Sequence, residues 1–272
     1  MRARYLGFLM ALLVAASAAA QPPAQAPSSN TATSAAQGAG SSKVWLDRPA
    51  DFEAFLRDAP FRRIEDVPIG VTRPQRGYFD PGGLVASAAW KLLPPGRSNG
   101  FWESYKSEIA AYELDKLLRL GMVPPTVEKR HRGERGAAIL WVEGVRPWKE
   151  VEHQPKPPKW NLEAVRMKMF DNLIGNIDRN AGNLIVDDDW NLYLIDHSRA
   201  FVSETRLRVE LTRVDGALWE RMQALDEATL TSALSQWLDG RTIRAILSRR
   251  DAMKKAIDAL VAKSSQAAVF IR

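Results

Sequence analysis

Apolar and polar positions in the first half of the chain form short alternating runs, which are typical of strands. Such runs fill residues 62–93, where Pro81-Gly82-Gly83 marks a tight connection. We expect two or three antiparallel strands there, ending at Lys91, after a short helix over residues 51–58. A further apolar strand is predicted over residues 137–145.

Two later segments show the spacing of amphipathic helices. Over residues 102–121 apolar side chains recur every three or four positions, and Gly121 stands where a helix cap belongs. Over residues 161–177 the same spacing predicts a buried helix with Asn161 as its N-cap. Successive amphipathic helices are expected after Phe201. The pattern therefore predicts an α+β protein with a strand-rich first half and a helix-rich second half.

The amino-terminal residues differ in composition from the rest. Residues 1–20 run from two arginines through an apolar stretch to Ala18 and Ala20, the pattern of a cleavable signal peptide. Residues 21–43 are rich in Pro, Ala, Ser and Gly, which predicts a disordered linker before a folded domain over residues 44–272. The apolar run is short for a membrane anchor, so we expect an exported protein without one; an uncleaved anchor is the alternative.

Composition excludes several kinds of site. The 272 residues include no cysteine, which rules out disulfides, thiolate catalysis and thiolate zinc sites. The three histidines, His131, His153 and His197, show no spacing typical of metal ligands. The net charge of +6 includes cationic runs at 128–135 and 241–250, which solvated turns or helix faces explain equally well. We do not expect nucleic acid binding, and we expect a monomer.

The segment DRNAGNLIVDDDWNLYLID, residues 178–196, reads as two short strands joined by an Asp-rich turn. A turn centred between Asp189 and Trp190 would place Asn183 opposite Asp196. Opposed residues of an antiparallel pair share one face, so these two side chains are expected to meet at the open end of the hairpin.

An amide oxygen and a carboxylate that converge in this way match what Mg²⁺ or Mn²⁺ takes when it also binds phosphate oxygens. Asp178 lies five residues before Asn183, where it can face the metal-bound group as a base or orienting carboxylate. The alternative is a structural hairpin whose polar ends are merely solvated.

The motifs GNIDRNAGNLIV and LYLIDHSRAF resemble the catalytic and metal-binding loops of atypical kinases of the phosphatidylinositol 3-/4-kinase-like group. The segment SEIAAYELDKLLRLGMVPPTV is similar to a helix of the secretory-pathway Golgi casein kinases and their bacterial relatives. The resemblance covers residues 62–202. It implies a two-lobed protein-kinase-like fold, with a small antiparallel β-rich N-lobe over about 44–145 and a mostly helical C-lobe over about 146–272.

The resemblance implies roles for residues of the first lobe. Lys91 would contact ATP phosphates and pair with Glu108, with Glu113 as the alternative partner. Because Lys91 ends an apolar strand and Glu108 lies in an Ala-rich helix face, both are expected to point inward, where each charge needs the other. The turn that contains Gly70 would cover the phosphates. The strand that contains Trp141 and Val142 would contact adenine.

The same resemblance implies that Asp178 is the catalytic residue and that Asn183 and Asp196 bind the metal. Two positions depart from the family pattern. Asn180 stands where His is usual, and Ser198 replaces a Gly, which could restrict the backbone of the metal loop.

Taken together, the sequence predicts an ATP- and divalent-metal-dependent phosphotransferase. It would move the γ-phosphate to a hydroxyl acceptor on a protein, lipid head group or small molecule. Two alternatives stay open: an exported, non-catalytic pseudokinase-type binding module, because ATP is scarce outside the cytosol, and a nucleotidyl transferase that moves AMP.

Overall fold

The computed structural model describes residues 43–68, 74–98 and 100–271. The predicted signal peptide and most of the predicted linker lie outside the described residues, as does Gly70 in the predicted phosphate-covering turn.

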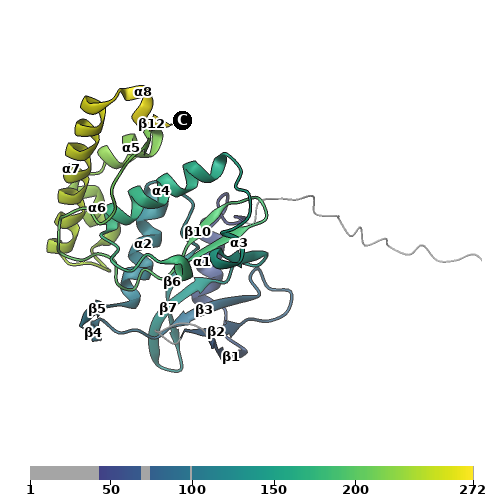
Figure 1. The fold of residues 1–272 in the computed structure, drawn as a ribbon. Helices are drawn as coiled ribbons and strands as arrows, with labels where there is room; N and C mark the ends of the chain where they lie inside the picture. Colours follow the sequence, from purple (N-terminus) through teal and green to yellow (C-terminus); the bar gives the residue numbers. More distant parts are fainter. Residues whose placement is uncertain (1–42, 69–73, 99, 272) are drawn as a thin grey trace, which may run out of the picture. The chain divides into compact units, whose positions relative to one another are not determined.

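An antiparallel sheet dominates the first half of the described chain (Figure 1). Its five strands lie in the order β1-β2-β3-β7-β6, with bounds β1 (Arg63–Asp66), β2 (Gln75–Tyr78), β3 (Ser87–Lys91), β7 (Glu134–Leu140) and β6 (Thr126–His131). Helix α1 (Pro49–Asp58) packs on β6 and β7. The predicted short helix and the three antiparallel strands ending at Lys91 are therefore confirmed.

Apolar side chains fill the space between α1 and the sheet, because α1 presents Phe52 and Leu56 inward while the strands present alternate residues. The largest members of this core are aromatic: Trp45, Phe52, Phe61, Phe79, Trp90 and Tyr193.

Strand β6 was not predicted, and the strand predicted over residues 137–145 starts and ends earlier, as β7. The cationic run over 128–135 forms the end of β6, a turn and the start of β7. Lys129 in this run is only 3% exposed, because its ammonium donates hydrogen bonds to the backbone carbonyls of Leu56, Arg57 and Ala59 at the end of α1. Lys129 thus caps the carboxyl-terminal end of α1. The hydrophobic pattern missed β6 because it counts every lysine as a surface residue.

Helix α2 (Tyr105–Leu117) crosses the sheet and packs on β6 and β7. The hydroxyl of Ser104 accepts a hydrogen bond from Lys106 N at 3.0 Å and so caps its start. Its end differs from the prediction, because the first left-handed residue after the last turn is Arg119, with φ 47°. Gly121, with φ 70°, is also left-handed but lies two residues further on.

Gly121 instead helps to bind a buried carboxylate. Both oxygens of Asp115 accept backbone hydrogen bonds, from Gly121 at 3.0 Å, Met122 at 2.8 Å and Val123 at 3.0 Å. Burial raises the pKa of Asp115 to about 6, against the opposing effect of these three donors. Asp115 thus fixes the path of the chain between α2 and β6.

Shorter elements connect this half to the helices. A two-stranded hairpin, β4 (Gly96–Ser98) with β5 (Phe101–Glu103), precedes α2. A three-stranded sheet follows in the order β10-β9-β8, with bounds β8 (Val145–Pro147), β9 (Leu184–Asp187) and β10 (Leu192–Leu194). The remaining elements are α3 (Trp148–Val151), α4 (Lys159–Ile174), the 3-10 turn η1 (Ala181–Asn183), β11 (Val214–Asp215), α5 (Gly216–Gln223), α6 (Glu227–Leu234), α7 (Gly240–Lys263), α8 (Gln266–Val269) and β12 (Phe270–Ile271).

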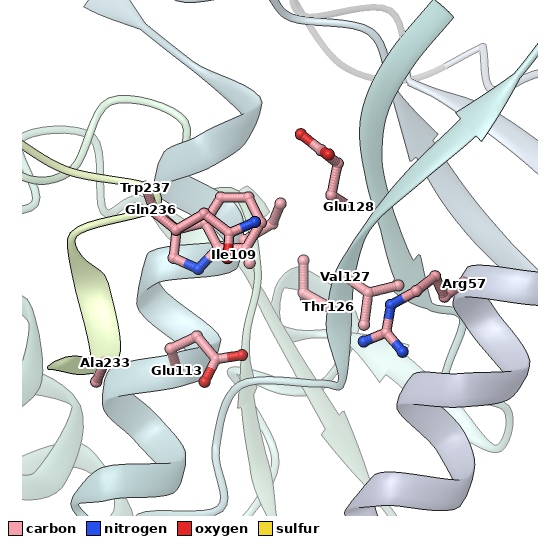
Figure 2. Close-up of a pocket in the computed structure, with 9 residues that line it drawn as sticks. All are labelled: Arg57, Ile109, Glu113, Thr126, Val127, Glu128, Ala233, Gln236 and Trp237. Atoms are coloured by element: carbon pink, nitrogen blue, oxygen red, sulfur yellow. The ribbon is translucent and has the colours of Figure 1, made fainter.

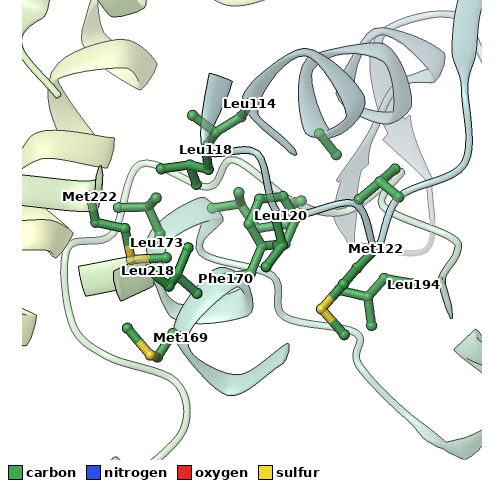
Figure 3. Packing of buried hydrophobic residues seen from close by; sticks show 14 of the residues in the cluster. Leu114, Leu118, Leu120, Met122, Met169, Phe170, Leu173, Leu194, Leu218 and Met222 are labelled. Carbon is green, nitrogen blue, oxygen red and sulfur yellow. The ribbon is translucent and has the colours of Figure 1, made fainter. Parts of the chain in front are cut away.

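Helix α4 begins two residues before the predicted N-cap, directly after Pro158, so Asn161 lies in its first turn and caps nothing. The last six residues of α4, 169–174, are buried, and Gly175 ends the helix with φ 61°. This segment contributes Met169, Phe170 and Leu173 to the helical core shown in Figure 3. Helix α2 adds Leu114 and Leu118 to the same core, so α2 packs against both the sheet and the helices.

The successive helices predicted after Phe201 are present as α5 to α8, which Figure 1 shows at the opposite end from β1 to β3. In the part of the chain that the structure describes, none of the helices has the length and apolar character needed to cross a bilayer.

Candidate active site

The hairpin β9–β10 forms as predicted, but its predicted register is wrong by one residue. Leu194 pairs with Leu184, and Ile195 N donates to Asn183 O at 3.2 Å, so Asn183 lies opposite Ile195 rather than Asp196. The turn has an odd number of residues, because Trp190 adopts a left-handed φ of 60°. A bulky residue rarely adopts this conformation, which explains why the sequence pattern favoured an even turn.

Asp196 reaches the predicted lysine in spite of the shifted register. The Asp196 backbone has a φ of 60°, and its Oδ1 lies 2.8 Å from Lys91 Nζ. Lys91 Nζ also donates to Glu108 Oε1 at 2.6 Å. Burial alone would lower the pKa of Lys91, but the carboxylates of Glu108 and Asp196 outweigh burial and raise it. Lys91 is therefore a charged group held between two carboxylates.

Glu108, and not Glu113, is the partner of Lys91. The Glu108 carboxylate is 2% exposed, and its second oxygen accepts a hydrogen bond from His197 N at 2.9 Å. Burial opposes its charge, yet the nearby Lys91 lowers the pKa of Glu108 below its ordinary value. Glu113 instead lies 3.1 Å from Lys116 and is about a quarter exposed. The sheet, α2 and the segment after β10 thus meet at one buried cluster.

Arg179 organises the loop around the predicted metal ligands, and the sequence analysis gave it no role. Its guanidinium binds both carboxylate oxygens of Asp171 on α4, at 2.8 and 3.0 Å. It also donates to the backbone carbonyls of Asn183 and Ile195, at 2.8 and 2.9 Å, and lies 3.0 Å from His197 Nε2. The one available signal was Asp171, an acidic residue within an apolar helix, since a buried carboxylate requires a cation.

Asp178 lies on the loop after α4, next to Asn183. Its backbone carbonyl accepts a hydrogen bond from Asn183 Nδ2 at 2.8 Å. Its side chain is 35% exposed, and its Oδ2 accepts from Arg199 Nη1 at 3.2 Å. Arg199 also pairs with the buried Glu103 of β5 at 2.6 Å. Arg199 is the second site residue that the sequence analysis missed, and it connects Asp178 to the β4–β5 hairpin.

Trp141 and Val142 lie at the other end of β3 from Lys91. Trp141 N donates to Ser87 O at 3.2 Å, and Ser87 is the first residue of β3, whose last residue is Lys91. Four residues of strand therefore separate Trp141 from Lys91 by roughly 13 Å. Val142 is buried, and the guanidinium of Arg76 lies 4.2 Å from a ring of Trp141. The structure therefore does not bring Trp141 and Val142 into contact with the Lys91 cluster.

Asn183 and Asp196 each keep an oxygen atom that could bind a divalent cation. Asn183 donates through its Nδ2 but accepts nothing at Oδ1 within the described residues, and Asp196 Oδ2 is likewise without a hydrogen bond there. Among the same residues, no three His, Asp or Glu side chains gather closely enough to hold a metal. Such a pair suits Mg²⁺ or Mn²⁺ bound partly through a phosphorylated ligand, rather than a cage made by the protein alone.

Two expectations about neighbouring residues are also resolved. His197 is 1% exposed and packs edge-on against Phe170, as expected for a histidine that packs near the site. Ser198 is not in the left-handed region, where a Cβ would be strained; the left-handed residues of this loop are Asp196, with φ 60°, and Phe201, with φ 63°. The Ser198 hydroxyl donates to Asp196 Oδ1 at 3.1 Å.

Solved structures share this arrangement of helices and strands. The Golgi casein kinase with Mn and ADP bound superposes with a TM-score of 0.62 at 15% sequence identity, over 82% of this chain and 78% of that chain. The fold is kinase-like. The hydra Fam20 structure with sugar gives a TM-score of 0.61 at 18% identity, over 80% of this chain and 90% of that chain.

The kinase-like fold confirms the fold class expected from the sequence motifs, with an antiparallel sheet in one half and helices in the other. A scan against protein-family models finds no match to the sequence, and no curated protein matches it. At this level of identity the likeness concerns the fold alone.

Proposed function

We propose that this protein is an ATP- and divalent-metal-dependent phosphotransferase. The observation that carries the proposal is the position of Lys91, whose ammonium lies within 2.8 Å of both Glu108 and Asp196. A kinase needs a cation for the nucleotide phosphates and a carboxylate for the metal at neighbouring points. Two carboxylates hold Lys91 charged and in place, so this cation is preorganised.

Asn183 and Asp196 are the proposed metal ligands. Each presents an oxygen without a partner among the described residues. Arg179 fixes the backbone carbonyls of Asn183 itself and of Ile195, the residue before Asp196. A bound Mg²⁺ or Mn²⁺ would neutralise charge on the phosphates during transfer.

Asp178 is the proposed catalytic residue. Arg199 occupies one of its oxygens, which leaves Oδ1 of a partly exposed carboxylate to accept a proton from, or orient, an acceptor hydroxyl. The hydrogen bond from Asn183 Nδ2 to Asp178 O ties this residue to a proposed metal ligand. Removal of the Asp178 carboxylate should therefore stop transfer without removing the nucleotide site.

The nucleotide base is proposed to bind near Trp141 and Val142, with Gly70 in the turn that covers the phosphates. The separation of roughly 13 Å along β3 lets an extended nucleotide reach from Trp141 to Lys91. The acceptor is a hydroxyl on a protein, lipid or small molecule, and the protein acts as an exported monomer. ATP and Mg²⁺ or Mn²⁺ are thus the proposed cofactors.

Thermal unfolding tests nucleotide binding. We would measure the melting temperature of the full chain with and without ATP and Mg²⁺ or Mn²⁺, beside Asp196→Ala. ATP at 100 times its dissociation constant should stabilise the fold by about 2.7 kcal/mol, and this gain should need the metal and vanish in Asp196→Ala. Asp258→Ala, which removes an exposed carboxylate of α7, is the matched control and should keep the shift. A wild-type protein that shows no shift would contradict the proposal.

Product analysis then separates the reactions. With γ-labelled ATP and a mixture of hydroxyl acceptors, label should enter an acceptor while ADP accumulates. Asp178→Asn should lose this transfer and keep the thermal shift. Release of labelled pyrophosphate, together with a gain of one adenylyl group in the mass of the acceptor, would favour nucleotidyl transfer. Binding without any turnover would favour a non-catalytic module.

A further inference from the structure

A cavity lies beside α2, and Lys91 is not among its lining residues. Its volume is about 400 Å³, and it is bounded by α2, β6, the end of α1 and the segment that follows α6 (Figure 2). Ile109 and Glu113, which are one helical turn apart, line it from α2. Neither Lys91 nor any proposed metal ligand lines it, so it is separate from the proposed nucleotide site.

One wall of the cavity is apolar. Ile109 of α2 is buried, and Trp237, from the segment between α6 and α7, packs against the cluster that contains it. Val127 of β6 also lines the cavity and is buried in the neighbouring core beneath α1. The Trp237 ring is only partly buried. These three side chains offer a surface on which an aliphatic stem can lose its contact with water.

Charged groups of opposite sign stand around this wall. The carboxylates of Glu113 and Glu128 are each about a quarter exposed. Their present partners are Lys116 at 3.1 Å for Glu113, and Tyr105 at 2.7 Å and Arg135 at 3.6 Å for Glu128. A carboxylate has about four lone-pair sites, so both retain the capacity to bind a cation.

Arg57 supplies the positive charge from α1. Figure 2 shows its guanidinium and the Glu113 carboxylate entering the cavity from opposite sides. Within the described residues Arg57 forms no ion pair, with either lining carboxylate or with any other acid. An arginine without an internal partner is free to bind a carboxylate bidentately.

We propose that this cavity binds a linear zwitterion with an aliphatic stem. Its ammonium or guanidinium group would bind Glu113, its carboxylate would bind Arg57, and its stem would cover Ile109 and Trp237. Two sources share this chemistry: a free ω-amino acid, or a polypeptide that ends in lysine and so presents a cation and a carboxylate together. A ligand at this site contacts the residue next to Glu108, so it would also stabilise the helix that holds Lys91.

The site can be tested without nucleotide, so the result is independent of the proposed phosphotransferase activity. We would titrate the full chain by calorimetry with ε-aminocaproate, hexylamine and caproate. The zwitterion should bind about tenfold or more tightly than either single-charge analogue, because each analogue loses one charge-assisted contact. Absence of binding by ε-aminocaproate at millimolar concentrations would overturn the proposal.

Variants of the lining charges give a crossed pattern. Glu113→Gln should weaken the binding of ε-aminocaproate and hexylamine but leave the binding of caproate unchanged. Arg57→Gln should weaken the binding of ε-aminocaproate and caproate but leave the binding of hexylamine unchanged. Glu220→Gln, which neutralises an exposed carboxylate on α5, is the matched control and should change none of them. Melting temperatures equal to wild type would show that all variants fold. If all variants weakened the binding of all three compounds equally, or if no variant weakened any binding, the assignment of the ammonium to Glu113 and of the carboxylate to Arg57 would be refuted.

A pair of peptides separates the two sources. A short peptide ending in lysine with a free carboxylate should bind more tightly than its carboxyamide if the occupant is a polypeptide end. Tighter binding of ε-aminocaproate than of the free-acid peptide would assign the cavity to a small molecule. Failure of both would overturn the proposal.

Discussion

Replacement of Glu108 by Gln removes one charge from the buried cluster around Lys91 and changes little else. The side chain keeps its size, and its amide oxygen can still accept the hydrogen bond from His197 N. Lys91, which is 7% exposed, loses its closest carboxylate at 2.6 Å and keeps that of Asp196 at 2.8 Å. The perturbation therefore measures the contribution of one buried ion pair.

The expected cost follows from what remains around Lys91. Removing one partner of a buried pair typically costs about 3 to 5 kcal/mol when the other charge is left alone. Because Asp196 still neutralises Lys91, we expect Glu108→Gln to lower the free energy of unfolding by about 2 to 3 kcal/mol. Lys91→Met should cost more, about 3 to 5 kcal/mol, because it leaves two carboxylates facing each other.

Urea unfolding followed by circular dichroism measures these differences. Glu113→Gln is the matched control, since it makes the same change on the same helix at an ion pair that is about a quarter exposed, where the cost should stay below about 1 kcal/mol. Equal losses for Glu108→Gln and Glu113→Gln would refute the argument that burial makes the first pair the stronger one.

The pH dependence of this effect has a definite sign. Lys91 holds the pKa of Glu108 below its unfolded value of about 4.3, although burial alone would raise it. The stability contributed by the Glu108 charge is therefore fully present above that pH and is lost as pH falls through the folded value. The difference between wild type and Glu108→Gln should stay constant above about pH 5 and shrink in acid.

Three further changes probe other features. Gly175→Ala places a Cβ 2.9 Å from the Arg249 guanidinium at a left-handed φ, so in urea unfolding it should cost about 1 to 3 kcal/mol more than Gly82→Ala, which has a similar φ but open space. Because burial raises the pKa of Asp115 to about 6, stability should fall as pH rises from about 4 to about 6, and thermal scans of Asp115→Asn should lack this slope. Ser198→Gly should keep the metal-dependent thermal shift with ATP, since Ser198 is not in the left-handed region.

Much of the first lobe followed from the sequence because local signals and packing agree there. The strand that ends at Lys91 is apolar and flanked by turn residues, and Glu108 lies on a helix with a capping Ser and an inward face. The family resemblance implied the pairing of Lys91 with Glu108, and this pairing agrees with the expectation that a buried charge needs a partner.

The hairpin shows where the sequence is insufficient. Its two strands were evident, but their register depended on the φ angle of one residue, Trp190, which no hydrophobic pattern encodes. Strand β6 was hidden for a related reason, because Lys129 lies at an inward position of that strand and its partners are backbone carbonyls far along the chain.

Arg179 and Arg199 were missed because their roles depend on tertiary contacts. Each guanidinium joins segments that are separate in sequence: Arg179 binds α4 and both strands of the hairpin, and Arg199 binds β5 and Asp178. Sequence reasoning proposed residues that would touch a ligand, whereas the arginines that contact those residues became evident only in the fold.

The contacts of Arg179 have a consequence for protein engineering. The guanidinium of Arg179 fixes the backbone at Asn183 and Ile195. If only the proposed ligands, Asn183 and Asp196, were transferred to another scaffold, the spacing between them would therefore be undefined. The smallest portable unit therefore also includes Arg179 and the Asp171 carboxylate that orients it. Lysine at position 179 would not serve, since one ammonium cannot reproduce a planar fork that serves a carboxylate and two carbonyls at once.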